Sequence, residues 1–223
     1  MKAVFFRDDD LGWDHAKFLR LLELVQEFEF KLNAEAIPLE ARKRFRPGEF
    51  AGCRRHLEVH SHGFGHANHE SLGKKAEFGR QRDPADVRQE LAAARLLTGE
   101  LFGDLYFPAF TPPWNRIEEQ FVPLLEETGF KVLSRDGPAR SGARILELNV
   151  ELDLHTDRKQ PGHSVEQLIQ LIEQSSSPQV GIMLHHGRMT DGDYDRLREL
   201  LATLKSGGAR SLFFSEIHGE QLG

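Results

Sequence analysis

The chain lacks features that several common classes of protein require. Its 223 residues include one cysteine, Cys53, so an internal disulfide and a multi-thiolate zinc site are excluded. Any metal must therefore be held by imidazole and carboxylate groups. No apolar run approaches the roughly 20 residues that cross a bilayer, and no apolar leader with a small-residue cleavage site follows the first residues. We expect a cytoplasmic protein with no membrane partner.

Excess positive charge and nucleotide-binding motifs are absent as well. The chain has 29 Lys and Arg against 35 Asp and Glu, a formal net charge of -6, which gives no indication of a nucleic-acid partner. It has no lysine-containing phosphate loop, and Asn68 stands where a third glycine would complete a dinucleotide turn after Gly63 and Gly65. The strained elbow around a nucleophilic serine is missing too. These absences argue against nucleotide-binding proteins and serine hydrolases.

Apolar runs of strand length alternate with segments of helical period, the pattern of parallel βα units. Strands are predicted at residues 3–6, 31–37, 57–59, 105–110, 131–133, 145–150, 180–184 and 211–214. Helices are predicted after Asp14, at 85–97, from an Asn115–Glu118 capping pair to 127, at 168–172 and at 194–204. The fold class is therefore α/β, a single distorted β/α barrel of about seven parallel strands that forms one domain over residues 1–223.

The segment 39–49 is rich in charge and contains Arg42, Lys43, Arg44 and Arg46. We interpret it as a solvated loop and prefer that interpretation to a basic contact with substrate.

Unusual polar residues follow the ends of several predicted strands. They are Asp8, Asp9 and Asp10, then His60, His62 and His66, then Pro112, Pro113 and Trp114, then Asp153, and finally His185 and His186. The carboxyl ends of parallel barrel strands share one face, so residues far apart in sequence meet there. We expect the active site at this face.

The pair His62 and His66 predicts a metal site. Their spacing of four residues brings two imidazoles within reach of one cation, and the aspartates after the first strand can add a carboxylate. Two imidazoles and one carboxylate leave coordination positions open for water and substrate, as a catalytic metal requires. We predict one divalent ion, with zinc preferred, although the same ligands accept cobalt, nickel, manganese or iron.

Two segments resemble motifs of the polysaccharide deacetylases, also called family four carbohydrate esterases. Residues 58–66 (EVHSHGFGH) are similar to the second motif of that family, and residues 7–12 (RDDDLG) to the first. The resemblance implies that Asp9 is the catalytic base and that Asp10 binds the metal together with the two histidines. Shifting the alignment by one residue would give these roles to Asp8 and Asp9, and the sequence leaves that choice open.

Two further segments extend the resemblance. Residues 110–115 (FTPPWN) resemble the third motif, which implies that Pro113 and Trp114 line the substrate groove, and residues 182–186 (IMLHH) resemble the fifth, which implies that His185 is the general acid. The family usually has an arginine before the prolines, where this chain has Thr111. Either Arg7 or Arg116 replaces that arginine, or the base is tuned differently.

The remaining candidates surround this site. Asn68 and His186 are predicted to contact substrate, while Arg7 and Asp153 are predicted to orient the base. The resemblance implies a hydrolase that removes an N- or O-linked acetyl group from a carbohydrate or related small metabolite with metal-activated water. The alternative is a metal-binding barrel without turnover, which the absent arginine supports. Hydrolysis of a phosphoester is less favoured, because one three-ligand site with few basic neighbours suits an acyl carbon better. The sequence does not predict the oligomeric state.

Overall fold

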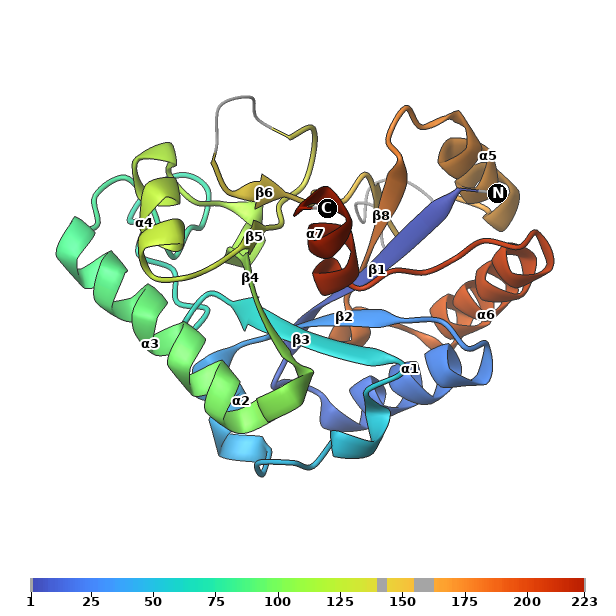
Figure 1. Ribbon diagram of the computed structural model, residues 1–223, viewed down its shortest axis with the longest axis horizontal. Coiled ribbons are helices and arrows are strands. Elements are labelled where there is room, and N and C mark those ends of the chain that lie inside the picture. Colours follow the sequence, from blue (N-terminus) through green and yellow to red (C-terminus); the bar gives the residue numbers. More distant parts are fainter. Residues whose placement is uncertain (1, 140–143, 155–162, 223) are drawn as a thin grey trace.

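The apolar runs form one parallel sheet that curls around an interior (Figure 1). The computed structural model describes residues 2–222 except 140–143 and 155–162. Its strands are β1 (Ala3–Leu11), β2 (Leu32–Ala36), β3 (Leu57–His62), β4 (Tyr106–Thr111), β5 (Val132–Leu133), β6 (Leu146–Glu147), β7 (Leu152–Asp153) and β8 (Gln179–Leu184). Their order in the sheet is β6-β5-β4-β3-β2-β1-β8-β7. Most positions of β1, β2, β3 and β8 are buried, as expected for parallel strands covered on both faces.

The two edge strands, β6 and β7, belong to one segment, residues 146–154. The amide of Leu148 donates to the carbonyl of Leu133 (3.0 Å), beside β5, and the amide of Glu151 donates to the carbonyl of Gly181 (2.9 Å), in β8. This segment therefore pairs first with β5 and then with β8. The fold is the predicted distorted β/α barrel, with eight parallel strands where the sequence predicts about seven, and β6 and β7 come from this one segment.

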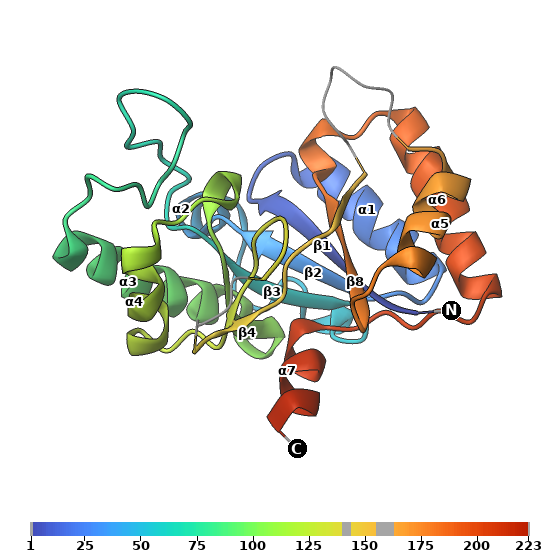
Figure 2. The same cartoon turned by 90° about the horizontal axis from the view of Figure 1, so that it is seen from above.

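Helices surround the strands of the barrel. They are α1 (His15–Glu27), α2 (Pro38–Arg44), α3 (Pro84–Phe102), α4 (Val122–Glu127), α5 (Val165–Gln174), α6 (Asp191–Ser206) and α7 (Phe214–Leu222). Short 3-10 turns are η1 (Ala51–Cys53), η2 (Gly103–Leu105), η3 (Pro113–Asn115), η4 (Glu119–Phe121) and η5 (His186–Arg188). In Figure 2, α1, α5 and α6 lie along one side of the strands and α3 and α4 along the other. None of the helices in the described residues has the length and apolar composition of a membrane-spanning segment.

Side chains cap the starts of α3, α5 and α6, but at the start of α1 Asp14 makes no side-chain cap hydrogen bond. The Asp83 carboxylate accepts a hydrogen bond from the Ala85 amide (2.7 Å) ahead of α3, and Ser164 forms a capping box with Gln167 at the start of α5. The predicted capping pair of Asn115 and Glu118 is wrong. Asn115 has φ 58°, and the long helix expected there is reduced to two 3-10 turns and α4.

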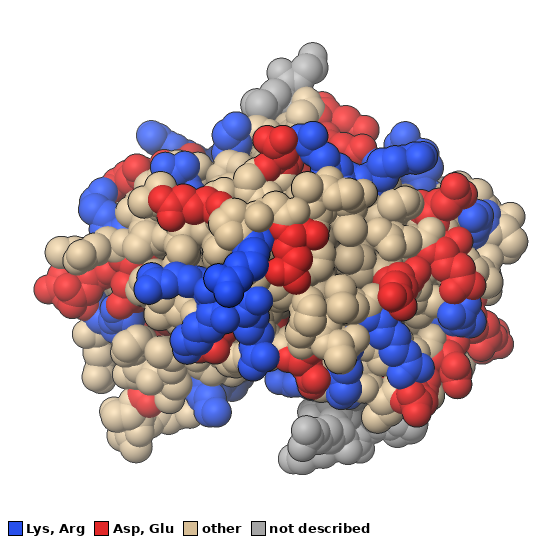
Figure 3. Space-filling model, turned by 90° about the horizontal axis from the view of Figure 1, so that it is seen from below, with Lys and Arg blue, Asp and Glu red and all other residues tan. Residues whose placement is uncertain are grey.

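Two other local predictions are wrong. The segment 211–214 is not a strand, because only Ser211 bridges to Val4 and Phe214 begins α7. The charged segment is not entirely a loop, because Pro38 opens α2 at a position that favours proline, and basic side chains in its last turn suit the negative end of the helix. The four basic residues of this segment are exposed, in agreement with a solvated face. Lys and Arg side chains gather on the side of the molecule where α2 lies (Figure 3).

Candidate metal centre and active site

A bulge at the end of β1 allows two consecutive aspartates to serve one site. Asp8 is paired with Ala34 of β2, but Leu11 is paired with Ala36, so β1 advances three residues while β2 advances two. Asp10 has φ 74° within this irregularity. Side chains of a regular strand alternate between faces, whereas a bulge redirects them. The bulge therefore lets the carboxylates of Asp9 and Asp10 both contact histidines at the carboxyl rim of the barrel.

The predicted ligands Asp10, His62 and His66 converge. Oδ1 of Asp10 lies 3.4 Å from Nε2 of His62 and 3.3 Å from Nε2 of His66, and ligand atoms of all three residues lie within 4.8 Å of one another. Two ligand atoms bound tetrahedrally to zinc at about 2.1 Å lie about 3.4 Å apart. The spacing of these atoms therefore fits a divalent ion held by two imidazoles and a carboxylate.

Neighbouring groups orient both imidazoles. Nδ1 of His62 lies 3.1 Å from the carbonyl oxygen of Thr111, a contact that leaves Nε2 as the coordinating nitrogen. The ring of His66 contacts two indoles, with its centroid 4.9 Å from that of Trp13 and 4.4 Å from that of Trp114. Trp13 is 37% exposed. Sequence analysis missed Trp13, because a lone aromatic residue after a strand carries no metal or catalytic signature.

The charges of Asp10 and His66 suit metal binding, whereas the raised pKa of His62 opposes it because an imidazole coordinates in its neutral form. Burial alone would raise the pKa of Asp10, but the hydrogen bond from His62 and the nearby histidines hold that pKa well below its usual range. Burial, together with the like charge of His62, lowers the pKa of His66 to about 4. Burial opposes protonation of His62 too, but Asp10 and Asp9 outweigh it and raise its pKa. At neutral pH Asp10 is a carboxylate and His66 is neutral, the forms that coordinate a metal.

Arg7 holds the carboxylate of Asp9 in a two-pronged contact. Nε of Arg7 lies 2.9 Å from Oδ1 and Nη2 lies 3.0 Å from Oδ2. The guanidinium is completely buried and also donates to Ser134 (3.0 Å) and to the amide oxygen of Asn115 (2.8 Å). Two residues apart on one strand, Arg7 and Asp9 share a face. Arg116, the other candidate for this contact, donates instead to the carbonyl of Lys75 (2.8 Å).

His185 directly follows β8 and lies close to Asp9. Its Nε2 is 3.8 Å from Oδ2 of Asp9. The side chains of His185 and Asp9 are 12% and 5% exposed. An imidazole and a carboxylate placed this close beside the three candidate ligands can both take part in proton transfer.

Asp8 and His186 form a separate buried pair. Oδ2 of Asp8 lies 2.7 Å from Nδ1 of His186, whose Nε2 lies 2.8 Å from the carbonyl oxygen of Trp13. Burial opposes protonation, but the charge and hydrogen bond of Asp8 raise the pKa of His186 to about 9. Asp8 therefore contacts His186 instead of the three candidate metal ligands. This arrangement favours Asp9 as the base and Asp10 as the ligand over the alternative alignment with Asp8 and Asp9. Completely buried, His186 offers no surface for the expected substrate contact.

The remaining predicted residues have different surroundings. Pro113 is buried and Trp114 is half-buried beside the cluster. Asn68 is exposed and closes a loop, because its amide nitrogen donates to the carbonyl of Glu70 and its amide oxygen accepts from the amides of Glu70 and Ala76 (3.0–3.1 Å). Its side chain therefore closes the loop, and the expected substrate contact stays a prediction. Asp153 ends β7 in register with Met183 of β8.

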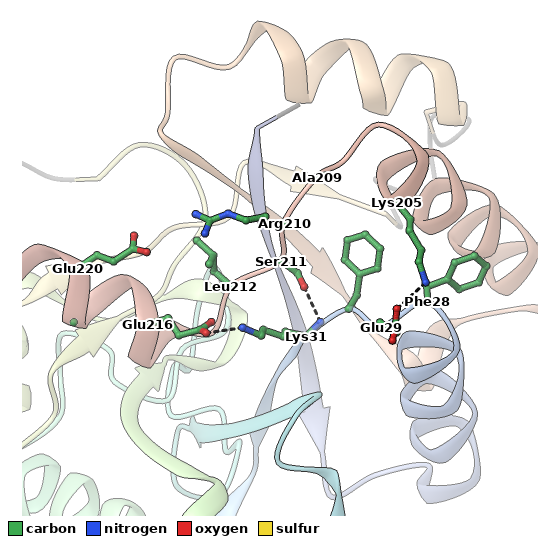
Figure 4. Close-up of a pocket in the computed structure, with 12 residues that line it drawn as sticks. Phe28, Glu29, Lys31, Lys205, Ala209, Arg210, Ser211, Leu212, Glu216 and Glu220 are labelled. Carbon is green, nitrogen blue, oxygen red and sulfur yellow. Dashed lines mark hydrogen bonds and ion pairs between the residues drawn. The ribbon is translucent and has the colours of Figure 1, made fainter.

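Two cavities differ in their relation to this site. One of about 500 Å³ is lined by residues of the loop 70–81 and by Asn115, which contacts Arg7. Figure 2 shows that the connection from β3 to α3, which contains this loop, projects from the molecule. Another of about 770 Å³ lies beside α7, near the amino ends of β1 and β2 and thus at the opposite end of the barrel (Figure 4). Its lysines are paired, Lys31 with Glu216 and Lys205 with Glu29.

No protein-family model and no curated protein sequence matches the chain. Solved structures do match, and they include several carbohydrate esterases of family 4. The chain is 13% identical to the family 4 carbohydrate esterase from Streptomyces lividans, with a TM-score of 0.59 over 95% of this chain and 92% of that one. It is 12% identical to the peptidoglycan deacetylase PdaC from Bacillus subtilis, with a TM-score of 0.61 over 99% and 92%.

BA3943 from Bacillus anthracis, described as a pseudoenzyme of the same family, has 15% identity and a TM-score of 0.64. That match covers 97% of this chain and 65% of BA3943, so the chain spans about two thirds of its length. A BA3943 mutant with restored enzymatic activity matches with a TM-score of 0.67. At these identities the likeness concerns the fold, which is the fold of the polysaccharide deacetylases.

Proposed function

We propose that the chain is a metal-dependent hydrolase that removes an N- or O-linked acetyl group from a carbohydrate or related metabolite. The observation that carries this proposal is the convergence of Asp10, His62 and His66, with Asp10 Oδ1 3.3–3.4 Å from the two Nε2 atoms. The base candidate Asp9 adjoins the first of these ligands in sequence, and the fold is one that known deacetylases share.

In this proposal the three converging residues hold one divalent ion, for which zinc is our first choice. Two imidazoles and a carboxylate suit zinc, and they leave positions open for water and substrate. When bound, such an ion supplies Lewis acidity toward an acyl oxygen and lowers the pKa of a bound water. His66 is neutral at neutral pH because its pKa is lowered to about 4, so a metal does not have to displace a proton from it.

In this proposal Asp9 acts as the general base and His185 as the general acid. Asp9 accepts a proton from the attacking water, and the bidentate guanidinium of Arg7 fixes the orientation of its carboxylate. His185 lies 3.8 Å from Asp9 and donates a proton to the departing amine or alkoxide. Both groups project from strand ends of a rigid barrel, so they are aligned before substrate arrives.

The substrate class follows from the site and from the proteins that share the fold. The indoles of Trp13 and Trp114 flank His66, and aromatic rings provide apolar faces on which a sugar ring can pack. One similar structure is a peptidoglycan deacetylase, and another is named a carbohydrate esterase. We therefore place an acetylated sugar, rather than a phosphoester, at this site.

A metal-binding barrel without turnover is the second candidate. It is favoured by the similarity to a pseudoenzyme and by Thr111 at the position before the prolines. Against it, Arg7 contacts the proposed base from β1, so the guanidinium is supplied by another strand. The two candidates share the metal and differ only in turnover.

Two variants test both candidates. We expect the purified protein to contain about one divalent ion per chain and His62→Ala to contain far less, as measured by elemental analysis. Asp9→Asn should keep the metal but lose most hydrolysis of a generic acetyl ester or chromogenic acetamide. Equal metal in the wild type and His62→Ala would refute the site. Metal without turnover in the wild type would establish the second candidate.

A further inference from the structure

The turn that carries His66 is organised by one buried carboxylate. Oε1 of Glu77 accepts hydrogen bonds from the amides of Gly65 (2.8 Å) and Ala67 (3.4 Å), and Oε2 accepts one from the amide of Phe64 (3.3 Å). Glu77 belongs to the loop between β3 and α3, about ten residues further along the chain, and is 1% exposed. These amides come from residues on both sides of His66, so the carboxylate defines the path of the backbone there.

Backbone amides are the hydrogen-bond partners of this carboxylate, and the charge of His62 also stabilises it. Within the described part of the chain no Lys or Arg pairs with it, and the nearby Arg82 donates to the backbone carbonyl of Glu77 (3.1 Å) and to the side chain of Glu90 (2.6 Å). A buried charge without hydrogen bonds is strongly unfavourable, and successive backbone amides are one of the few groups that compensate for it. Glu77 and the turn are therefore matched to each other.

The backbone of the turn is also built to receive this side chain. Gly63 has φ +63°, and a Cβ at this position would lie 2.0 Å from Oε2 of Glu77 and 2.6 Å from Cγ of Pro113. His66 has φ 56°, a left-handed conformation that is uncommon for residues other than glycine. The space that Gly63 leaves is thus filled by Glu77 and Pro113, and the ligand residue lies within the hydrogen-bonded turn.

We propose that Glu77 is a positioning residue for the metal centre, which holds the turn 63–67 so that Nε2 of His66 faces Asp10. The inference rests on the proposed function only in assigning a metal to the cluster. Groups that orient metal ligands typically change metal affinity by roughly 10–100-fold when they are removed. Glu77 acts through the backbone on either side of His66, not through the imidazole, and no sequence motif records it.

Glu77→Gln is the decisive variant. Glutamine has nearly the same shape, but its amide nitrogen is a donor and would face backbone donors, so at least one of the three hydrogen bonds is lost. Glu90→Gln is the matched control, because Glu90 lies nearby, pairs with Arg82 and contacts no metal ligand. We expect Co²⁺ to bind Glu77→Gln roughly 10–100-fold more weakly than wild type, with a changed visible absorption spectrum. Glu90→Gln should bind like the wild type.

A second measurement separates this inference from the metal proposal. In the metal-free protein, hydrogen exchange at the amides of Phe64, Gly65 and Ala67 should be faster in Glu77→Gln than in wild type, while amides of β3 remain unchanged. If Glu77→Gln does not fold, Gly63→Ala should give the same two effects, because its methyl group displaces the carboxylate. Wild-type affinity, spectrum and exchange in Glu77→Gln would overturn the proposal. If the wild-type protein binds no Co²⁺ while exchange still increases, the metal site is refuted and the proposed role is limited to ordering the turn.

Discussion

The contact between Arg7 and Asp9 distinguishes this site at the scale of single residues. The deacetylase family that the motifs resemble usually has an arginine before the prolines. This chain has Thr111 there, and the carbonyl oxygen of Thr111 orients His62. The guanidinium comes from β1, two residues before the carboxylate that it binds, and it also contacts Asn115 directly after Trp114. Arg7 thereby links the proposed base, Asp9, to the 3-10 turn that contains Trp114.

Replacing this arginine should impair turnover without removing the metal. Arg7→Lys keeps the positive charge but loses the fork that binds both oxygens of Asp9. We expect kcat to fall on the order of 10–100-fold, the effect of losing about 1.5–3 kcal/mol of charge-assisted hydrogen bonding. Initial rates and elemental analysis of the same preparation would measure this. An unchanged kcat would contradict the role of Arg7, and loss of metal would move that role to the ligand cluster.

At the scale of elements, the start of α7 is where the sequence-based prediction of a strand is wrong. The apolar segment 211–214 has the length and composition of a strand, but the chain turns into a helix at Phe214. The ring of this residue stacks on His60 (4.6 Å between centroids) and packs edge-on against Phe5 (5.1 Å). Its contacts with residues of β3 and β1 show that α7 closes one end of the barrel interior. Packing against other strands decided its structure, and local propensity did not.

Phe214→Ala should therefore destabilise the whole barrel. Removing a completely buried phenyl ring typically costs about 3–5 kcal/mol, because the lost burial adds to the cost of the cavity. Urea denaturation at neutral pH would measure the loss. Glu220→Ala, an exposed change on the same helix, should stay within about 0.5 kcal/mol of wild type. Equal stability of Phe214→Ala and wild type would mean that α7 does not contribute to the core.

At the scale of the whole molecule, two buried histidines couple the stability of the fold to pH. His60 lies between Glu35 (2.8 Å) and Glu58 (2.9 Å) inside the barrel, and His186 lies against Asp8. Burial opposes protonation of both, but the neighbouring carboxylates raise the pKa of each to about 9 from 6.5. Both imidazoles are therefore protonated in the folded protein at neutral pH.

The free energy of unfolding should fall as the solution becomes alkaline. A histidine whose pKa is higher in the folded state than in the unfolded state stabilises the folded protein. This contribution is complete below about pH 6.5 and is lost as the pH rises through about 9. The loss between these limits is on the order of a few kcal/mol. His186→Gln should flatten the decrease in urea-denaturation curves measured between these limits, whereas the exposed His69→Gln should not. A stability that is constant over this range would contradict the assignment of charged imidazoles.

Sequence alone determined the features that repeat or have a fixed spacing. Alternating apolar runs predicted a parallel barrel of about seven strands, and strand ends rich in polar residues predicted the face where Asp10, His62 and His66 meet. The hydrophobic pattern carries this information because a helix buries one face at every turn, and a strand covered on both faces is apolar along most of its length.

Tertiary structure decided where individual side chains point. The bulge after Asp8 brings Asp9 and Asp10 to the site. His186 is buried against Asp8, and Glu77 accepts hydrogen bonds from the turn that contains His66. The indole of Trp13 lies against that histidine for the same reason. These placements depend on irregular backbone and on contacts between distant segments, neither of which leaves a periodic trace in the sequence.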